Sequence, residues 1–168
     1  MKKVLMSTIV LLALSMVLIS PVKAITKEPY TSHMELELLD PGKRWVDEEG
    51  IVQIRDSYWN GAYEGISGTE TYEGTYECWV SLSLNPLTGE GTLSEKWLIT
   101  TSQGTLAGSD RGKITMPQFS GMFVGTHGTG DFKGVKIMGS FEGYHPIIDG
   151  EIDLLHVVAD AWGTIVRP

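Results

Sequence analysis

A glycine-rich stretch between residues 125 and 143 constrains the fold more than any other part of the chain. It reads GTHGTGDFKGVKIMGSFEG, with six glycines in nineteen residues. The apolar residues at positions 135, 137 and 141 share one parity, which is typical of a strand with one apolar face. Gly128 and Gly130 precede them and permit the positive φ angles of a tight turn. The stretch therefore predicts a hairpin-like corner of a closed β-sheet.

Alternation of apolar and polar residues indicates strands along most of the remaining chain. From residue 76 to 84 the even positions hold Tyr, Cys, Val, Leu and Leu, whereas the odd positions are mainly polar. Residues 85–89 (NPLTG) carry turn chemistry and predict a hairpin with a strand over 92–101. By the same criteria, further strands are expected over residues 33–39, 51–58, 62–68, 105–108, 113–116, 119–126 and 151–166.

Turns and loops are expected between these strands. The dipeptide Asn60-Gly61 predicts a type I′ hairpin turn, and residues 109–112 (SDRG) predict another. Residues 43–50 form an expected charged loop, in which Trp45 folds back as a lid. No segment after residue 24 has a 3.6-residue apolar period, so any helix is a single turn, expected at residues 129–133.

Roughly eight short strands with regular spacing predict an all-β fold, an antiparallel eight-stranded closed β-barrel. Closure removes exposed sheet edges from a protein that has no helix to cover them. A β-sandwich predicts a similar pattern and is the alternative. An eight-stranded barrel encloses a space wide enough for side chains or for one small ligand.

Residues 1–24 have the layout of a secretory signal peptide. Two lysines precede an uncharged, mostly apolar run of 16 residues, and small residues stand before a cleavage site after Ala24. That run is shorter than the roughly 20 residues needed to span a bilayer. The expectation is a secreted or extracytoplasmic protein, with an uncleaved N-terminal anchor as the alternative. Residues 25–32 are expected to be a short lead-in, and 33–168 a single barrel domain.

Charge and cysteine content exclude several classes of protein. All 21 acidic residues but only 10 of the 13 basic ones follow residue 24, giving that part a formal net charge of −11. Such a surface disfavours nucleic acid, whose phosphates need Lys and Arg. No membrane insertion is expected after cleavage, and assembly into a homo-oligomer remains an open alternative.

Cys78 is the only cysteine, so no intramolecular disulfide forms. The parity of Cys78 in its expected strand predicts a core position.

The segment from Gly128 to Val135 (GTGDFKGV) resembles the G-T-G-x-F-x-G-x element of the allene oxide cyclase barrel-like and dirigent-like proteins. The hairpin rhythm over residues 33–165 is similar to that family as well. The resemblance implies an eight-stranded barrel of calycin or allene oxide cyclase type with a central cavity. Some members of the family close a ring or guide a coupling in a hydrophobic pocket without a cofactor. The catalytic positions of the cyclases do not match residues of this chain, so the resemblance does not carry their activity over.

Few residues are candidates for chemistry. His156 and Asp160 share the parity of Ile152, Leu154, Val158 and Trp162, and this parity is expected to face the barrel interior. A histidine beside a carboxylate can act as a general base, whereas a buried histidine bonded to a backbone carbonyl is the structural alternative. Glu95, on the parity of Leu93 and Trp97, is a second inward carboxylate. The residues expected to bind a ligand are Trp97, Tyr76, Phe141 and Trp162.

No cofactor or metal is expected. The glycine stretch lacks both the dinucleotide-binding spacing and the P-loop, and the four histidines form no ligand pair of short spacing. The sequence is thus most consistent with an exported barrel that binds a small apolar ligand without catalysis. The alternative is a cofactor-free cyclase or isomerase that uses His156, Asp160 or Glu95. A structural protein with a solidly packed barrel is a third hypothesis.

Overall fold

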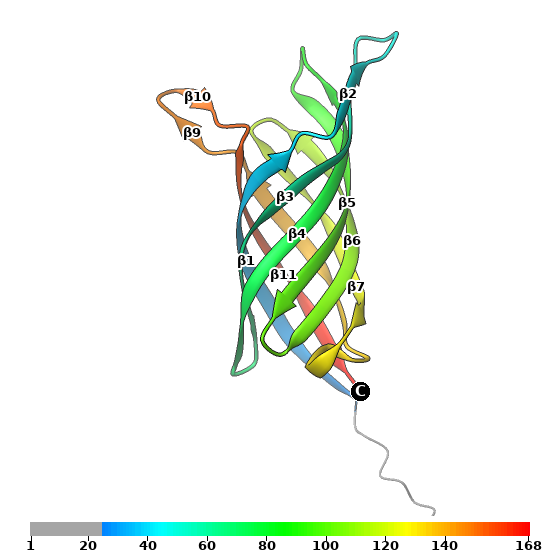
Figure 1. The fold of residues 1–168 in the computed structure, drawn as a ribbon, viewed down its shortest axis with the longest axis vertical. Helices are drawn as coiled ribbons and strands as arrows, with labels where there is room; N and C mark the ends of the chain where they lie inside the picture. Colours follow the sequence, from blue (N-terminus) through cyan, green and yellow to red (C-terminus); the bar gives the residue numbers. More distant parts are fainter. Residues whose placement is uncertain (1–24) are drawn as a thin grey trace, which may run out of the picture.

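The structure, a computed structural model, describes residues 25–168 as a closed antiparallel β-barrel of eight strands (Figure 1). Each strand pairs with its neighbour around the ring in the order β1-β11-β8-β7-β6-β5-β4-β3, and β3 pairs with β1 to close it. The barrel strands are β1 (Thr26–Asp40), β3 (Val52–Ser67), β4 (Glu70–Asn85), β5 (Glu90–Thr101), β6 (Gly104–Thr115), β7 (Gln118–Gly128), β8 (Lys136–Tyr144) and β11 (His156–Arg167). The closed barrel expected from the sequence is confirmed.

Three short elements supplement the barrel. β2 (Lys43–Val46) pairs with the start of β3, β9 (Ile147–Ile148) and β10 (Glu151–Ile152) form a small hairpin, and η1 (Gly130–Phe132) is a single 3-10 turn. The expected single-turn helix is therefore confirmed. Among residues 25–168, no helix has the length and apolar character needed to span a bilayer. The signal peptide expected at residues 1–24 lies outside the described residues.

The two ends of the barrel differ. We call the end that carries β2, the β4–β5 turn and the β9–β10 hairpin the open end (the upper end in Figure 1), and the end with η1 and the C-terminus the closed end. Buried side chains fill the closed end: Tyr63, Tyr72, Phe132, Val135 and Ile165. The rings of Tyr72 and Phe132 pack 5.2 Å apart between centroids. Because these buried side chains meet there, the closed end is plugged by protein.

The glycine-rich stretch forms the corner expected from its sequence. β7 ends at Gly128, η1 turns the chain, and β8 returns with Ile137 and Phe141 facing inward. Gly130 has φ +57°, and a Cβ there would lie 2.2 Å from the backbone oxygen of Gln103. Only glycine meets both conditions without strain. The turn at η1 closes one end of the barrel, whereas Ile137 and Phe141 on β8 line the cavity described below.

Two expected turns are wrong. β3 continues through Asn60 and Gly61, and the chain reverses only after Ser67. A Cβ on Gly61 would lie 1.9 Å from the backbone oxygen of Glu35 on β1, so this glycine permits a close approach of two strands. Residues 109–112 lie within β6, not in a turn. In both cases, residues common in turns serve the interior of a long, curved strand.

Two further segments differ from expectation at the open end and the N-terminal side. The lead-in expected over residues 25–32 belongs to β1, where Tyr30 and Ser32 are buried inside the barrel. The loop expected over 43–50 contains strand β2. Trp45 on this strand is exposed and packs beneath the guanidinium of Arg55, 5.6 Å from the ring centroid, so it is not a lid.

The inward face of β11 is opposite to the one expected. Val157, Ala159, Ala161 and Ile165 are buried, whereas His156, Asp160 and Trp162 face outward. The long strand expected from residue 151 is interrupted after β10, so the parity of Ile152 and Leu154 does not continue into β11. Both of these apolar residues are exposed near the open end.

Candidate ligand-binding cavity

A cavity of about 350 Å³ occupies the barrel from the open end to below its middle. Its wall receives side chains from all eight barrel strands and is mostly apolar, including Met34, Leu82, Ile99, Ile114 and Phe123. The space remains because the inward residues of β11 are small, Ala159 and Ala161 among them. The cavity contradicts the third hypothesis, a structural protein with a solidly packed barrel.

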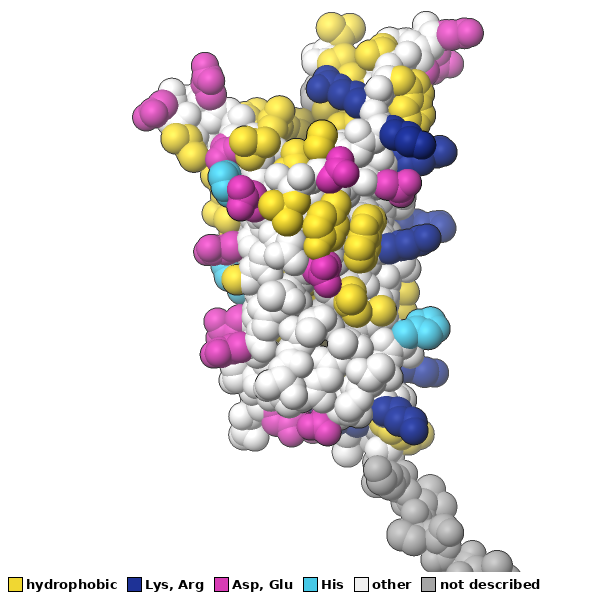
Figure 2. All heavy atoms as spheres, viewed as in Figure 1, with side chains coloured by type: hydrophobic (Ala, Val, Ile, Leu, Met, Phe, Trp, Pro, Cys, Tyr) yellow, Lys and Arg dark blue, Asp and Glu magenta, His cyan; other side chains and the backbone are white. Residues whose placement is uncertain are grey.

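Exposed hydrophobic side chains surround the open end. They come from the end of β1, from β2, from the β4–β5 turn and from the segment around the β9–β10 hairpin: Leu39, Trp45, Val46, Leu87, Ile147, Ile148, Ile152, Leu154 and Leu155. Figure 2 shows hydrophobic side chains mainly over the upper and middle parts of the visible face and few of them over the lower part. The apolar surface of the cavity thus continues onto the rim of the open end.

One polar cluster interrupts the apolar wall midway along the barrel. Glu95 on β5 accepts a hydrogen bond of 2.5 Å from the hydroxyl of Tyr76 on β4, and the Cys78 thiol donates a second one. Asp110 on β6 is the register partner of Glu95. Residues directly opposite in an antiparallel pair have Cβ atoms about 5 Å apart. The two carboxyl groups therefore extend from neighbouring strands into the same part of the cavity.

Burial changes the acidity of this cluster. Loss of hydration raises the pKa of Glu95 to about 7, although the hydrogen bonds from Tyr76 and Cys78 oppose the shift. Burial, together with the charge of Glu95, raises the pKa of Asp110 to about 9. Near neutral pH the pair therefore retains at least one proton. Burial raises the pKa of the Cys78 thiol well above its usual range, which makes it an unreactive core residue.

Two buried polar atoms of the cavity wall have no hydrogen-bond partner among the described residues. They are Oδ1 of Asp110 and Nε1 of Trp97, on side chains that are 7% and 3% exposed. The indole of Trp97 stacks on Tyr76 with ring centroids 6.1 Å apart. It also fills the space that a side chain at Gly125 would occupy, since a Cβ there would lie 2.4 Å from the ring. Unpaired buried polar groups are uncommon and often mark functional sites.

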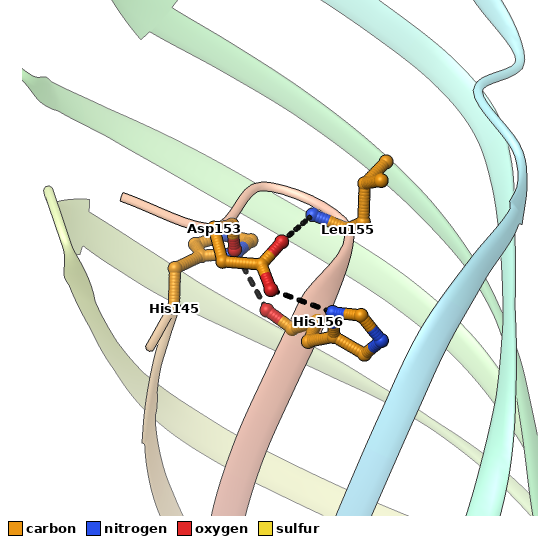
Figure 3. Close-up of polar contacts among 4 residues, drawn as sticks. All are labelled: His145, Asp153, Leu155 and His156. Atoms are coloured by element: carbon orange, nitrogen blue, oxygen red, sulfur yellow. Dashed lines mark hydrogen bonds and ion pairs between the residues drawn. The ribbon is translucent and has the colours of Figure 1, made fainter. Parts of the chain in front are cut away.

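A histidine-centred network fixes the rim beside the cavity mouth (Figure 3). Nδ1 of His145 lies 3.0 Å from the backbone oxygen of His156 and 3.3 Å from that of Asp153. Because both carbonyl oxygens only accept hydrogen bonds, Nδ1 of His145 carries the proton and donates it. Asp153 also accepts hydrogen bonds from the backbone of Leu155 and the ring of His156. Burial lowers the pKa of His145.

Of the site residues predicted from the sequence, some line the cavity and others lie on the outer surface. Glu95, Trp97, Tyr76 and Phe141 all line the cavity, on the faces that their parity indicates. The interior position expected for His156, Asp160 and Trp162 is wrong, since all three are exposed.

The outward residues of β11 have partners elsewhere. His156 pairs with Asp153 through a contact of 2.7 Å, and Asp160 pairs with His33 on β1 at the same distance. His156 and Asp160 therefore neither meet each other nor reach the cavity, and general-base chemistry by this pair is excluded in this arrangement.

Asp110 was missed from the sequence because SDRG has the composition of a turn. A signal was present: residues 106, 108, 110, 112 and 114 read Leu, Gly, Asp, Gly and Ile, which is an inward face with one carboxylate.

In residues 25–168 no group of three or more His, Cys, Asp or Glu side chains has the arrangement of a metal site.

No protein-family model, curated protein or solved structure matches the chain. Its fold and its cavity are therefore described from its own residues.

Proposed function

We propose that the protein binds one small, mostly apolar molecule in the barrel cavity and does so without catalysis. The observation that carries the proposal is the apolar cavity of about 350 Å³ inside a closed barrel. Its size and lining are typical of small-molecule sites, which combine hydrophobic walls with a few convergent polar groups. The resemblance of the Gly128–Val135 segment to cavity-bearing barrels supports it.

The ligand enters through the open end. The closed end is filled by buried aromatic and aliphatic side chains, whereas the open end carries exposed apolar residues continuous with the cavity wall. We further propose that residues 1–24 direct the protein out of the cytoplasm, so that the ligand is one met in an extracytoplasmic space.

Native mass spectrometry of the protein purified from its own host tests for a bound molecule directly. A matched pair of variants tests the location. Ala161→Leu places three extra carbon atoms in the cavity, whereas Thr100→Leu adds a similar apolar side chain on the outer surface. We expect Ala161→Leu to lower the occupancy or the affinity at least tenfold and Thr100→Leu to leave both unchanged. Equal binding by both variants, with both folded, would refute a site inside the barrel.

A cofactor-free cyclase or isomerase is the second candidate function. The specific observation that favours it is the Glu95–Asp110 pair, because a carboxyl group with a pKa near neutrality can donate or accept a proton in an apolar pocket. Chromatographic separation of the recovered molecule distinguishes the two functions, because an isomer has the same mass as its parent but a different retention time. A molecule recovered unchanged after prolonged incubation supports binding alone, while conversion to an isomer that Glu95→Gln abolishes supports catalysis.

A further inference from the structure

Glu95 and Asp110 are two buried carboxyl groups with no cationic partner among the described residues. The titratable groups that face them are Tyr76 and Cys78 from β4, and the two carboxyl groups face each other from β5 and β6. The other ionisable residues of the cavity wall are Tyr30 on β1, Arg44 on β2 and His145, the last two near the open end.

An unpaired oxygen atom of Asp110 indicates which chemical group of a ligand the two carboxyl groups can bind. Oδ1 of Asp110 has no hydrogen-bond partner among residues 25–168, although the side chain is only 7% exposed. A buried carboxyl oxygen without a donor costs free energy that a bound donor would restore. When Asp110 is ionised, a hydrogen-bond donor carried by a molecule in the cavity would satisfy this oxygen.

Aromatic side chains lie near the same carboxyl groups. Tyr76 stacks on Trp97, and Phe123 is the register partner of Asp110. The faces of such rings attract cations, most strongly where water is excluded. Two carboxyl groups and an aromatic wall are together a setting that favours a positive charge.

We propose that the ligand is an apolar amine whose protonated nitrogen lies against Glu95 and Asp110. This inference rests on the proposed function, since it names the ligand class of the same cavity. An ammonium group supplies hydrogen-bond donors to both carboxyl groups and neutralises their charge, so both can ionise in the complex. An alcohol of the same length supplies one donor and leaves the second carboxyl group to keep its proton or to remain an uncompensated charge.

Three probes of matched chain length test the head group: decylamine, decanol and decanoic acid. Their affinities follow from displacement of the neutral fluorophore N-phenylnaphthylamine at physiological salt. At pH 8 we expect decylamine to bind at least tenfold tighter than decanol, and decanoic acid to bind most weakly. At pH 5 the preference for decylamine over decanol should shrink toward one, because both carboxyl groups bind protons while the amine remains charged.

Two double variants locate the effect. Glu95→Gln with Asp110→Asn should abolish the preference for the amine and keep the affinity for decanol. The matched control, Glu73→Gln with Glu142→Gln, removes two charges from exposed positions and should behave as the wild type. Equal binding of decanol and decylamine by the wild type, or a preference that survives in the buried double variant, overturns the inference. If none of the three probes binds, the proposed function fails instead.

Calorimetry of the wild type provides a test that needs no variant. Titration of decylamine near pH 8 in buffers of different ionisation enthalpy reports the protons released on binding. We expect about one proton to be released as the amine displaces it from the carboxyl pair. Proton uptake, or none exchanged, contradicts the inference.

Discussion

The hydroxyl of Tyr76 donates a hydrogen bond of 2.5 Å to Oε1 of Glu95, from one strand of the barrel wall to the next. A third strand, β6, brings Asp110 opposite Glu95. The barrel thus stabilises one carboxyl group with donors and leaves its neighbour without them. The donors that oppose the shift at Glu95, together with the charge of Glu95 acting on Asp110, explain why the pKa of Asp110 is raised more than that of Glu95.

Removal of the Tyr76 hydroxyl should make Glu95 a weaker acid. The hydrogen bond from Tyr76 favours the charged carboxylate, so we expect Tyr76→Phe to raise the pKa of Glu95 by roughly 1, the equivalent of one charge-assisted hydrogen bond. Carbon-13 NMR of the Glu95 carboxyl group across a pH titration measures it. Tyr58→Phe is the control, because Tyr58 donates to Glu77 on the outer side of the barrel. An unchanged pKa in Tyr76→Phe would contradict the role assigned to this bond.

Stability should fall as the pH rises. Glu95 and Asp110 have ordinary pKa values of 4.5 and 3.8, raised in the folded protein to about 7 and about 9. Between pH 4 and 9 the folded state therefore binds more protons than the unfolded state, so the free energy of unfolding decreases with pH across this window. Urea unfolding at a series of pH values measures the slope.

The variant Asp110→Asn assigns this slope to the carboxyl pair. It keeps the shape of the side chain and cannot ionise, so we expect a higher Tm than wild type at pH 8 and little difference at pH 4. His33 also loses its favourable contact with Asp160 as the pH rises, but both groups are largely exposed and contribute little. A wild-type slope retained by Asp110→Asn would place the effect elsewhere.

Trp97 and Gly125 should show strong energetic coupling. A Cβ at residue 125 would lie 2.4 Å from the indole of Trp97 and 2.9 Å from Ile137, so Gly125→Ala should cost about 1–3 kcal/mol by overpacking. In a Trp97→Phe background the shorter ring leaves room, and the same change should cost less. A double-mutant cycle of urea unfolding measures the coupling. Purely additive costs would show that the indole does not fill this space.

His145 should control the rim of the cavity. His145→Ala removes the N–H donor shared by the carbonyl oxygens of Asp153 and His156, so residues 146–155 should exchange amide hydrogen faster while the barrel strands do not. Lowering the pH should also make the amide hydrogens of this segment exchange faster. Burial lowers the pKa of His145, so below its ordinary value of 6.5 the unfolded state binds a proton that the folded state resists. Unaltered exchange in the variant would show that the hairpin is held by its other contacts.

Asp160→Asn should change surface acidity and nothing inside the barrel. The carboxylate of Asp160 raises the pKa of His33, so the variant should return the histidine toward its ordinary value in a proton NMR titration. Ligand affinity should be unchanged, because Asp160 faces outward. A loss of affinity would instead connect the outer face of β11 to the cavity.

Regular alternation predicted those parts of the barrel where large apolar residues mark the inner face. On β4 and β5 the inward positions hold residues such as Tyr76, Leu82 and Trp97, and the sequence assigned both strands and their faces correctly. On β11 the inward residues include Ala159 and Ala161, which carry a weak hydrophobic signal. The apolar residues Ile152 and Leu154, which precede β11 at the rim, suggested that the opposite face of this strand points inward.

Of the two carboxyl groups in the candidate site, the sequence identified only one. Glu95 lies between two apolar residues of its own parity, so its direction could be inferred locally. Asp110 lies between Gly108 and Gly112 in a segment with the composition of a turn. Its position opposite Glu95 depends on the register between β5 and β6, which no local pattern specifies.

The pairing of β1 with both β3 and β11 has a kinetic consequence. Thr26 is the register partner of Arg167, so the ring closes through contacts between the two ends of the described chain. Closing so long a loop is entropically costly, and proteins dominated by such distant contacts fold slowly. Until β11 arrives, β1 and β8 each retain an unpaired edge that can recruit another chain. The completed barrel has no such edge among its eight strands, and the hazard of aggregation is confined to the interval before closure.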